Sequence, residues 1–265
     1  MTLPQQWNAR DYAQHCSAQL QWAEELLPKL GLQGDESLLD LGCGEGKITA
    51  LIAARVPRGR VLGIDLSAEM IALASAQFPP ADHANLSFLQ MDVGHIDLDQ
   101  HFDLAFSNAA LHWVPDHLAV LRGVRAHLRP GGRILFQMGG RGNAAGIFAA
   151  LEEVLARPAW RDHFQGFTTP YSFYGPEQYQ DWLPRTGFRP QRAELVPKDM
   201  QHADAAGLRG WLRTTWFPYT DRLPEDRREA FLGEVVATYL AMYPADQAGC
   251  THVAMVRLEV EAHAC

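Results

Sequence analysis

The chain has 265 residues, of which 47% are hydrophobic and 20% are charged. This is the composition of a folded globular protein and excludes an intrinsically disordered one. Asp and Glu number 31 against 23 Lys and Arg, and this net charge of −8 disfavours a general nucleic-acid-binding protein, which needs a basic surface.

The first half of the chain alternates short apolar strands with helices. The predicted strands cover residues 37–41, 60–65, 86–91, 102–107 and 133–138. The predicted helices cover residues 18–30, 48–55, 67–77 and 117–127, and Ser67 is the expected N-cap of the third. Strands separated by helices of this length need crossover connections, which make the strands parallel. With helices on both faces, the pattern predicts a doubly wound α/β sheet.

The second half is less regular. We expect a helix near 146–157, an aromatic loop at 167–174, a strand at 188–197, a helical segment at 204–243 and a strand at 252–262. The loss of alternation this late favours a cap over the sheet rather than a second domain. The expected organisation is one domain with an N-terminal helical segment (1–34), a cofactor-binding core (35–138) and the remaining strands with the cap (139–265).

The cysteines and the hydropathy pattern favour a cytoplasmic protein. The four cysteines are too far apart for the paired spacing of a zinc site, so we expect reduced thiols and no metal. No stretch approaches the ~20 apolar residues that cross a membrane. Residues 1–22 lack the apolar run of a signal peptide, so we expect no membrane contact.

A glycine-rich turn follows the first predicted strand. Gly42, Gly44 and Gly46 allow the backbone to turn sharply and to approach a ligand closely. A nicotinamide dehydrogenase would need G-x-G-x-x-G, but here the third glycine comes one residue early. Asp40 and Glu45 flank the turn and would repel a pyrophosphate. The turn therefore favours a ligand with an amine or a sulfonium.

Carboxylates also follow the next two strands. Asp65 comes 19 residues after Gly46, where an acid can accept hydrogen bonds from both ribose hydroxyls. Asp92 follows the third strand, in a position that suits an adenine amino group. Because ligands of open α/β sheets bind at the carboxyl ends of the strands, these acids predict a nucleoside site there.

Five segments together resemble the class I S-adenosylmethionine-dependent methyltransferases. They are LLDLGCGEG, VLGIDLS, QMDV, FDLAFSNAALHWVPD and LRPGGRI, in the family's order, over about residues 35–138. The resemblance implies a seven-stranded, mostly parallel Rossmann-like sheet with a helical cap, and S-adenosyl-L-methionine as cofactor. It implies these cofactor-binding residues: Asp40 at the amino group, Gly42, Gly44 and Gly46 beside the methionine part, Asp65 and the adjoining Leu66 at the ribose, Asp92 and Val93 at the adenine, and Asn108 near the amino acid moiety.

Residues 107–117 resemble a narrower group, the trans-aconitate and juvenile hormone acid methyltransferases, which methylate carboxylates. Residues 11–19 also resemble the start of the juvenile hormone enzymes. The first resemblance implies a substrate contact for Trp113, with His112 beside it, and the second implies one for Gln19. A carboxylate is already a nucleophile near pH 7, so its methylation requires alignment rather than a base. If the acceptor were an amine or a phenol, His112 would be the candidate base. Each of the three also has an ordinary interpretation, as a packed or surface side chain.

The acceptor itself stays open between two classes. Arg209 or Arg213 could bind a second carboxylate of a polyacid, whereas the aromatic residues of 167–174 could enclose an apolar acid. The expected partner is thus a small molecule, a carboxylic acid, bound by a monomer or homodimer. The alternatives are N- or O-methylation of another metabolite and a non-catalytic S-adenosylmethionine-binding module.

Overall fold

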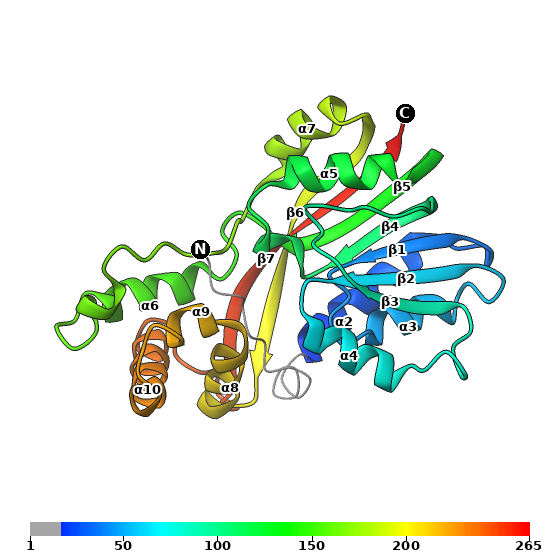
Figure 1. The fold of residues 1–265 in the computed structure, drawn as a ribbon. Coiled ribbons are helices and arrows are strands. Elements are labelled where there is room, and N and C mark those ends of the chain that lie inside the picture. Colours follow the sequence, from blue (N-terminus) through cyan, green and yellow to red (C-terminus); the bar gives the residue numbers. More distant parts are fainter. Residues whose placement is uncertain (1–16) are drawn as a thin grey trace.

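The computed structural model describes the backbone of residues 17–265 and the side chains of residues 22–265, built around one seven-stranded sheet (Figure 1). Its strand order is β3-β2-β1-β4-β5-β7-β6. The strands are β1 (Ser37–Leu41), β2 (Arg60–Asp65), β3 (Leu86–Gln90), β4 (Phe102–Asn108), β5 (Leu128–Gly139), β6 (Phe188–His202) and β7 (Thr251–Ala264). Only β7 runs antiparallel to its neighbours, so the predicted mostly parallel, doubly wound sheet is confirmed.

Helices cover both faces of this sheet (Figure 1). One face carries α2 (Ser17–Leu26), the 3-10 turn η1 (Leu27–Leu30), α3 (Lys47–Ala53) and α4 (Ala68–Gln77), and the other carries α5 (His117–Ala126) and α7 (Pro176–Arg185). The hydroxyl of Ser67 accepts the backbone N–H of Met70, which confirms the predicted cap of α4.

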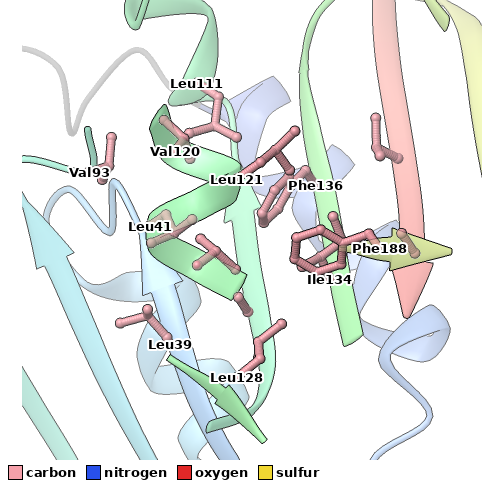
Figure 2. Close-up of a cluster of buried hydrophobic side chains, with 14 of the residues drawn as sticks. Leu39, Leu41, Val93, Leu111, Val120, Leu121, Leu128, Ile134, Phe136 and Phe188 are labelled. Atoms are coloured by element: carbon pink, nitrogen blue, oxygen red, sulfur yellow. The ribbon is translucent and has the colours of Figure 1, made fainter. Parts of the chain in front are cut away.

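The strands are uniformly apolar because both of their faces are buried. In β1, Leu38 packs toward α3, whereas Leu39 and Leu41 pack toward the opposite face. Figure 2 shows the apolar cluster on the face of Leu39 and Leu41, in which Val120 and Leu121 of α5 lie against side chains of the sheet. A rigid sheet held from both sides gives the loops at its carboxyl edge a fixed platform.

A helical cap lies beside the sheet rather than on it. It comprises α6 (Ala145–Leu155), η3 (Arg161–Phe164), α8 (Ala205–Thr215), α9 (Phe217–Thr220) and α10 (Glu225–Met242). Figure 1 shows β6 (yellow) and β7 (red) running on from the sheet into this cap. A separate apolar cluster holds the cap helices to these strand extensions, with Met200 of β6 and Met255 of β7 among its members.

The second half of the chain departs from the prediction at several elements. The expected helical segment at 204–243 is present and is divided into three helices, since Pro218 lies at the start of α9 and Pro224 precedes α10. Helix α7, with proline at its first position and Pro184 inside it, was not predicted. Strand β5 begins at Leu128 rather than at residue 133, and β6 continues to His202 rather than ending at residue 197. No helix in the described part of the chain is both long and apolar enough to cross a bilayer.

A half-buried histidine at the start of β7 links β6 to the connection before β7. The Nδ1 and Nε2 atoms of His252 lie 2.8 Å from a carboxylate oxygen of Asp199 and 3.3 Å from one of Asp246. These two carboxylates raise the pKa of His252 above its ordinary value. A raised folded-state pKa contributes stability that is complete below the unfolded pKa and disappears as pH rises through the folded pKa.

We therefore expect His252→Ala to lower the melting temperature at pH 6 more than at pH 9. Thermal unfolding of the variant and the wild type at both pH values measures this difference. His101→Ala, at an exposed histidine on another loop, is the control. An equal deficit at both pH values would contradict the ion pairs.

Candidate functional site

The glycine-rich turn after β1 has all three glycines in the left-handed region. Gly42, Gly44 and Gly46 have φ of +73°, +53° and +83°. A Cβ on Gly42 would lie 2.2 Å from the Cβ of Ala110, and one on Gly46 would lie 2.6 Å from Cζ of Phe88. A Cβ on Gly44 would meet no described atom within 4 Å. Two of the glycines are therefore fixed by packing, while Gly44 faces open space that a ligand can enter.

Two carboxylates lie beneath this turn. Asp65, at the end of β2, accepts the backbone N–H groups of Gly44 and Ser67, each at 2.9 Å. Asp40, in β1, is 2% exposed and accepts the hydroxyl of Thr49 at 2.7 Å. Burial, together with the nearby charge of Asp65, raises the pKa of Asp40 to about 7, although Thr49 partly offsets this. A bound cation would favour the ionised forms of both acids, so their placement fits a positively charged ligand.

The other predicted cofactor residues lie along the same edge. Strand β3 ends at Gln90, so Asp92 lies two residues beyond it rather than at its end, and its carboxylate accepts the N–H of Gly94 at 2.8 Å. Val93 is buried in the core, Leu66 is 63% exposed, and Asn108 ends β4. Since β3, β2, β1 and β4 are consecutive in the sheet, the set follows four adjacent strand ends.

An aromatic pocket adjoins this edge. Its lining comes from α2, the sheet, the segment after β4, the aromatic loop before α7 and the cap: Trp22, Ala109, His112, Trp113, Asn143, Tyr171, Phe173, Met200, Trp211, Thr215, Trp216, Met255 and Arg257. Gly42 packs closely against Ala110, whose chain neighbour Ala109 lines the pocket, so the glycine-rich turn and the pocket wall are connected through this segment. A ligand on the turn and a second molecule in the pocket would therefore be neighbours.

His112 is held in one tautomer. Its Nδ1 atom lies 3.4 Å from the backbone nitrogen of Gly139 and accepts that N–H, so its proton is on Nε2. Burial, and secondarily the charge of Arg257, lower the pKa of His112 well below its ordinary value. The ring is therefore neutral, and its lone pair is already occupied. In this state His112 is a hydrogen-bond donor and a poor general base.

Arg257 supplies the positive charge of the pocket. It lies in β7, is 3% exposed, and its guanidinium carbon lies 5.4 Å from the ring centre of Trp22. The backbone beside it is fixed, because Val256 donates its N–H to the side chain of Asn143 at 3.0 Å. The sequence interpretation missed Arg257. The available signal was an arginine between Val256 and Leu258 in an apolar strand. Burying such a charge is unfavourable unless another group compensates it, so the arginine marks a candidate functional position.

The structure brings together only part of the predicted acceptor site. Trp113, His112, Tyr171 and Phe173 line the pocket, as do Trp211 and Trp216 of the cap. Phe167 packs against Tyr219 inside the cap, and the Tyr174 hydroxyl binds the backbone oxygen of Pro115 instead.

The remaining acceptor-side candidates lie elsewhere. Neither Arg209 nor Arg213 lines the pocket, and Arg213 lies 3.2 Å from Glu229. The side chain of Gln19 is outside the described residues, so its predicted contact stays a prediction. The described residues contain no group of three or more metal-ligating side chains.

Comparisons with known proteins agree with this geometry. A family model described as a methyltransferase domain matches residues 38–132. The chain is 31% identical to the trans-aconitate 2-methyltransferase of Variovorax paradoxus (strain S110), over 97% of both proteins. It is 33% identical to that of Deinococcus radiodurans, over 91% of this chain and 93% of the relative.

Solved structures show the same fold. The YcgJ protein from Bacillus subtilis matches 92% of this chain and 98% of its own, with a TM-score of 0.62 at 16% identity. The motifs, the sheet order and the full-length relatives together show that this chain belongs to the class I S-adenosylmethionine-dependent methyltransferases and is related to their trans-aconitate 2-methyltransferase group.

Proposed function

We propose that this methyltransferase esterifies a small carboxylic acid, that is, that it methylates a carboxylate oxygen. The observation that carries the proposal is the buried guanidinium of Arg257 beside the neutral His112 in the pocket. An arginine can bind a carboxylate through two parallel hydrogen bonds. The names of the relatives, which specify an acid substrate, support the same chemistry.

The cofactor would be held at the carboxyl edge of β1 to β4. Its ribose would lie at Asp65, with Leu66 adjoining, its amino acid part at Gly44 and Asn108, and its adenine at Asp92 and Val93. S-adenosylmethionine supplies a methyl group on a positively charged sulfur. Asp40 and Asp65 add negative charge at that edge, which favours a cation over a diphosphate.

The pocket residues orient the acceptor rather than deprotonate it. The Nε2–H of His112 and the guanidinium of Arg257 are both donors, so they suit an acceptor that is already an anion. The aromatic walls exclude bulk water from it. An amine or phenol acceptor would need a base, and the occupied lone pair of His112 argues against that alternative. Trp113, from the same segment, lies on the acceptor side.

Transfer of labelled methyl from S-adenosylmethionine to acids, amines and phenols tests this function. We expect a base-labile ester on an acid. With S-adenosylmethionine saturating, so that its positive charge keeps Asp40 ionised, we expect kcat/KM for the acid to be flat from pH 6 to pH 8, since a carboxylate with a pKa near 4 is ionised throughout. Label that survives alkali on an amine, or a rate that increases tenfold per pH unit in this range, would reject carboxylate methylation. Tight cofactor binding without turnover of any acceptor would indicate a non-catalytic binding module.

The ribose contact has its own test. Asp65→Ala should weaken S-adenosylhomocysteine binding about 10- to 100-fold, because ribose hydroxyls would lose a charged partner worth ~1.5–3 kcal/mol. Isothermal calorimetry measures the affinity, and Glu69→Ala, at an acid in the first turn of α4, is the control. Unchanged affinity in Asp65→Ala would remove this residue from the cofactor site.

A further inference from the structure

We infer that the buried pair of His117 and Tyr179 is a positioning pair for methyl transfer, because it fixes the 3-10 turn η2 (Leu111–Trp113), which carries two residues of the pocket wall. Neither side chain of the pair is among the described residues that line the pocket. The inference goes beyond the proposed function and rests on it in one respect, namely that the acceptor binds in this pocket.

The ring of His117 is held by a hydrogen bond at each nitrogen. His117 is the first residue of α5 and is 1% exposed. Its Nε2 atom lies 2.8 Å from the backbone oxygen of Leu111, and its Nδ1 atom lies 2.7 Å from the hydroxyl oxygen of Tyr179 in α7. A backbone oxygen can only accept, so the ring proton is on Nε2 and Nδ1 accepts the Tyr179 hydroxyl. Burial lowers the pKa of His117 to about 4, which keeps this ring neutral near pH 7.

The hydrogen bond from His117 holds η2 at its first residue. The backbone oxygen of Leu111 also accepts the N–H of Val114 at 2.9 Å, which is the turn's own hydrogen bond. His117 occupies the second lone pair of this oxygen and links the turn to the start of α5. Since the next two residues are His112 and Trp113, the direction of both side chains toward the pocket depends on this link.

Two more segments of the pocket wall meet the pair. The Tyr179 hydroxyl oxygen lies 3.5 Å from the sulfur of Met138, the residue directly before Gly139 in β5. The ring of Tyr174, in the aromatic loop before α7, meets that of His117 edge to face, with ring centres 4.7 Å apart. The turn η2, the end of β5 and the aromatic loop are thus fixed relative to one another through one buried ring.

The Tyr179 hydroxyl is the group on which this arrangement depends. Without it, Nδ1 of His117 would be buried without a donor, which is unfavourable. Any rotation or tautomer change of the ring that relieves this also gives up the bond to Leu111. The turn η2 would then lose its anchor, while the strand ends of β1 and β2 would keep their contacts. The pair therefore acts on the acceptor side, through η2, and not on cofactor binding.

Tyr179→Phe tests the inference, with Tyr239→Phe as the matched control. Tyr239 is also buried, and its hydroxyl donates to the backbone oxygen of His252 at 2.6 Å, outside the pocket lining. We expect both variants to lower the melting temperature. Only Tyr179→Phe should lower kcat/KM, about tenfold and at unchanged affinity for S-adenosylhomocysteine, because a displaced acceptor is misaligned. Wild-type kcat/KM in Tyr179→Phe, or an equal loss of cofactor affinity, would overturn the inference.

The kinetics use trans-aconitate, cinnamate and phenethylamine as probe acceptors, and the variants are compared on the one that the wild type methylates fastest. If that probe is the amine, carboxylate methylation is rejected, but the ratio between Tyr179→Phe and the wild type still tests the pair. Glutamine at position 117 carries an amide N–H that can reach Leu111, whereas leucine carries none. His117→Gln should therefore retain about ten times the kcat/KM of His117→Leu, and equal rates would overturn the inference.

Hydrogen exchange gives a readout that needs no acceptor. The N–H of Ser172 donates to the backbone oxygen of His112 at 2.8 Å, so its protection reports whether η2 keeps its place. In Tyr179→Phe, exchange at Ser172 should accelerate about tenfold more than exchange at Val61, an amide of β2 on the cofactor side. Equal acceleration at the two amides would show only a general loss of stability and would overturn the inference.

Discussion

Arg257→Ala is expected to lower kcat/KM for the acid acceptor about 100-fold while leaving the affinity for S-adenosylhomocysteine unchanged. Two charge-assisted hydrogen bonds to a carboxylate would be lost, at ~1.5–3 kcal/mol each. Part of that loss is regained in the variant, where water can enter the vacated space, so ~3 kcal/mol is the expected net effect. Steady-state kinetics with labelled S-adenosylmethionine and calorimetry of the cofactor product measure the two quantities separately.

Two further variants make this result specific. Arg257→Lys keeps the charge but not the two-pronged geometry, so its activity should lie between the wild type and Arg257→Ala. Arg185→Ala removes an exposed arginine that pairs with Asp181 on α7, a helix that contributes no residue to the pocket lining, and should retain full activity. If Arg257→Ala kept wild-type kinetics, or if it lost cofactor affinity to the same degree as turnover, the guanidinium would not be the carboxylate anchor.

The sheet could be predicted because each of its strands is determined by a short stretch of neighbouring residues. Each strand is a short apolar run bounded by turn residues, and the helices between them have the length that crossovers need. Helix α7 could not be predicted in the same way, because Pro184 lies inside it and only Tyr179 and Leu183 are buried from it. The breaks on either side of α9 do have a local signal, in Pro218 and Pro224, but the exact ends of the cap helices depend on their mutual packing.

The strand-end residues and the pocket residues differ, for the same reason, in how far the sequence alone predicts them. The position of Asp40, Gly42 and Asp65 at neighbouring strand ends could be predicted because each lies in or directly after a short apolar strand. The proposed acceptor pocket combines side chains from distant segments, including Trp22, His112 and Arg257, and their meeting depends on the tertiary fold. A single sequence shows such residues only as isolated anomalies, such as a charge in an apolar strand.

Gly42→Ala is expected to lower the melting temperature by about 10 °C and to abolish methyl transfer. An alanine at φ of +73° has left-handed backbone strain of ~1–2 kcal/mol. Its Cβ would also lie 2.2 Å from that of Ala110, and overpacking of this kind costs ~1–3 kcal/mol. Together these lower the free energy of unfolding by ~3 kcal/mol. Each kcal/mol lowers the melting temperature of a chain of this size by roughly 2–4 °C, which gives the expected decrease of about 10 °C. Because Ala110 leads into the pocket wall, the displacement would disturb the acceptor side as well.

Gly44→Ala separates an effect on ligand binding from an effect on the stability of the fold. It has the same kind of backbone strain at φ of +53°, but its Cβ meets no described atom within 4 Å. We therefore expect a decrease of only a few degrees in melting temperature, ~1 kcal/mol of strain, and a loss of S-adenosylhomocysteine affinity of more than tenfold. Thermal unfolding and calorimetry of both variants test this contrast. If Gly44→Ala bound the nucleoside as tightly as the wild type, the open space above this glycine would not be where the cofactor passes, and the positions assigned to Asp65 and Asn108 around it would have to be abandoned with it.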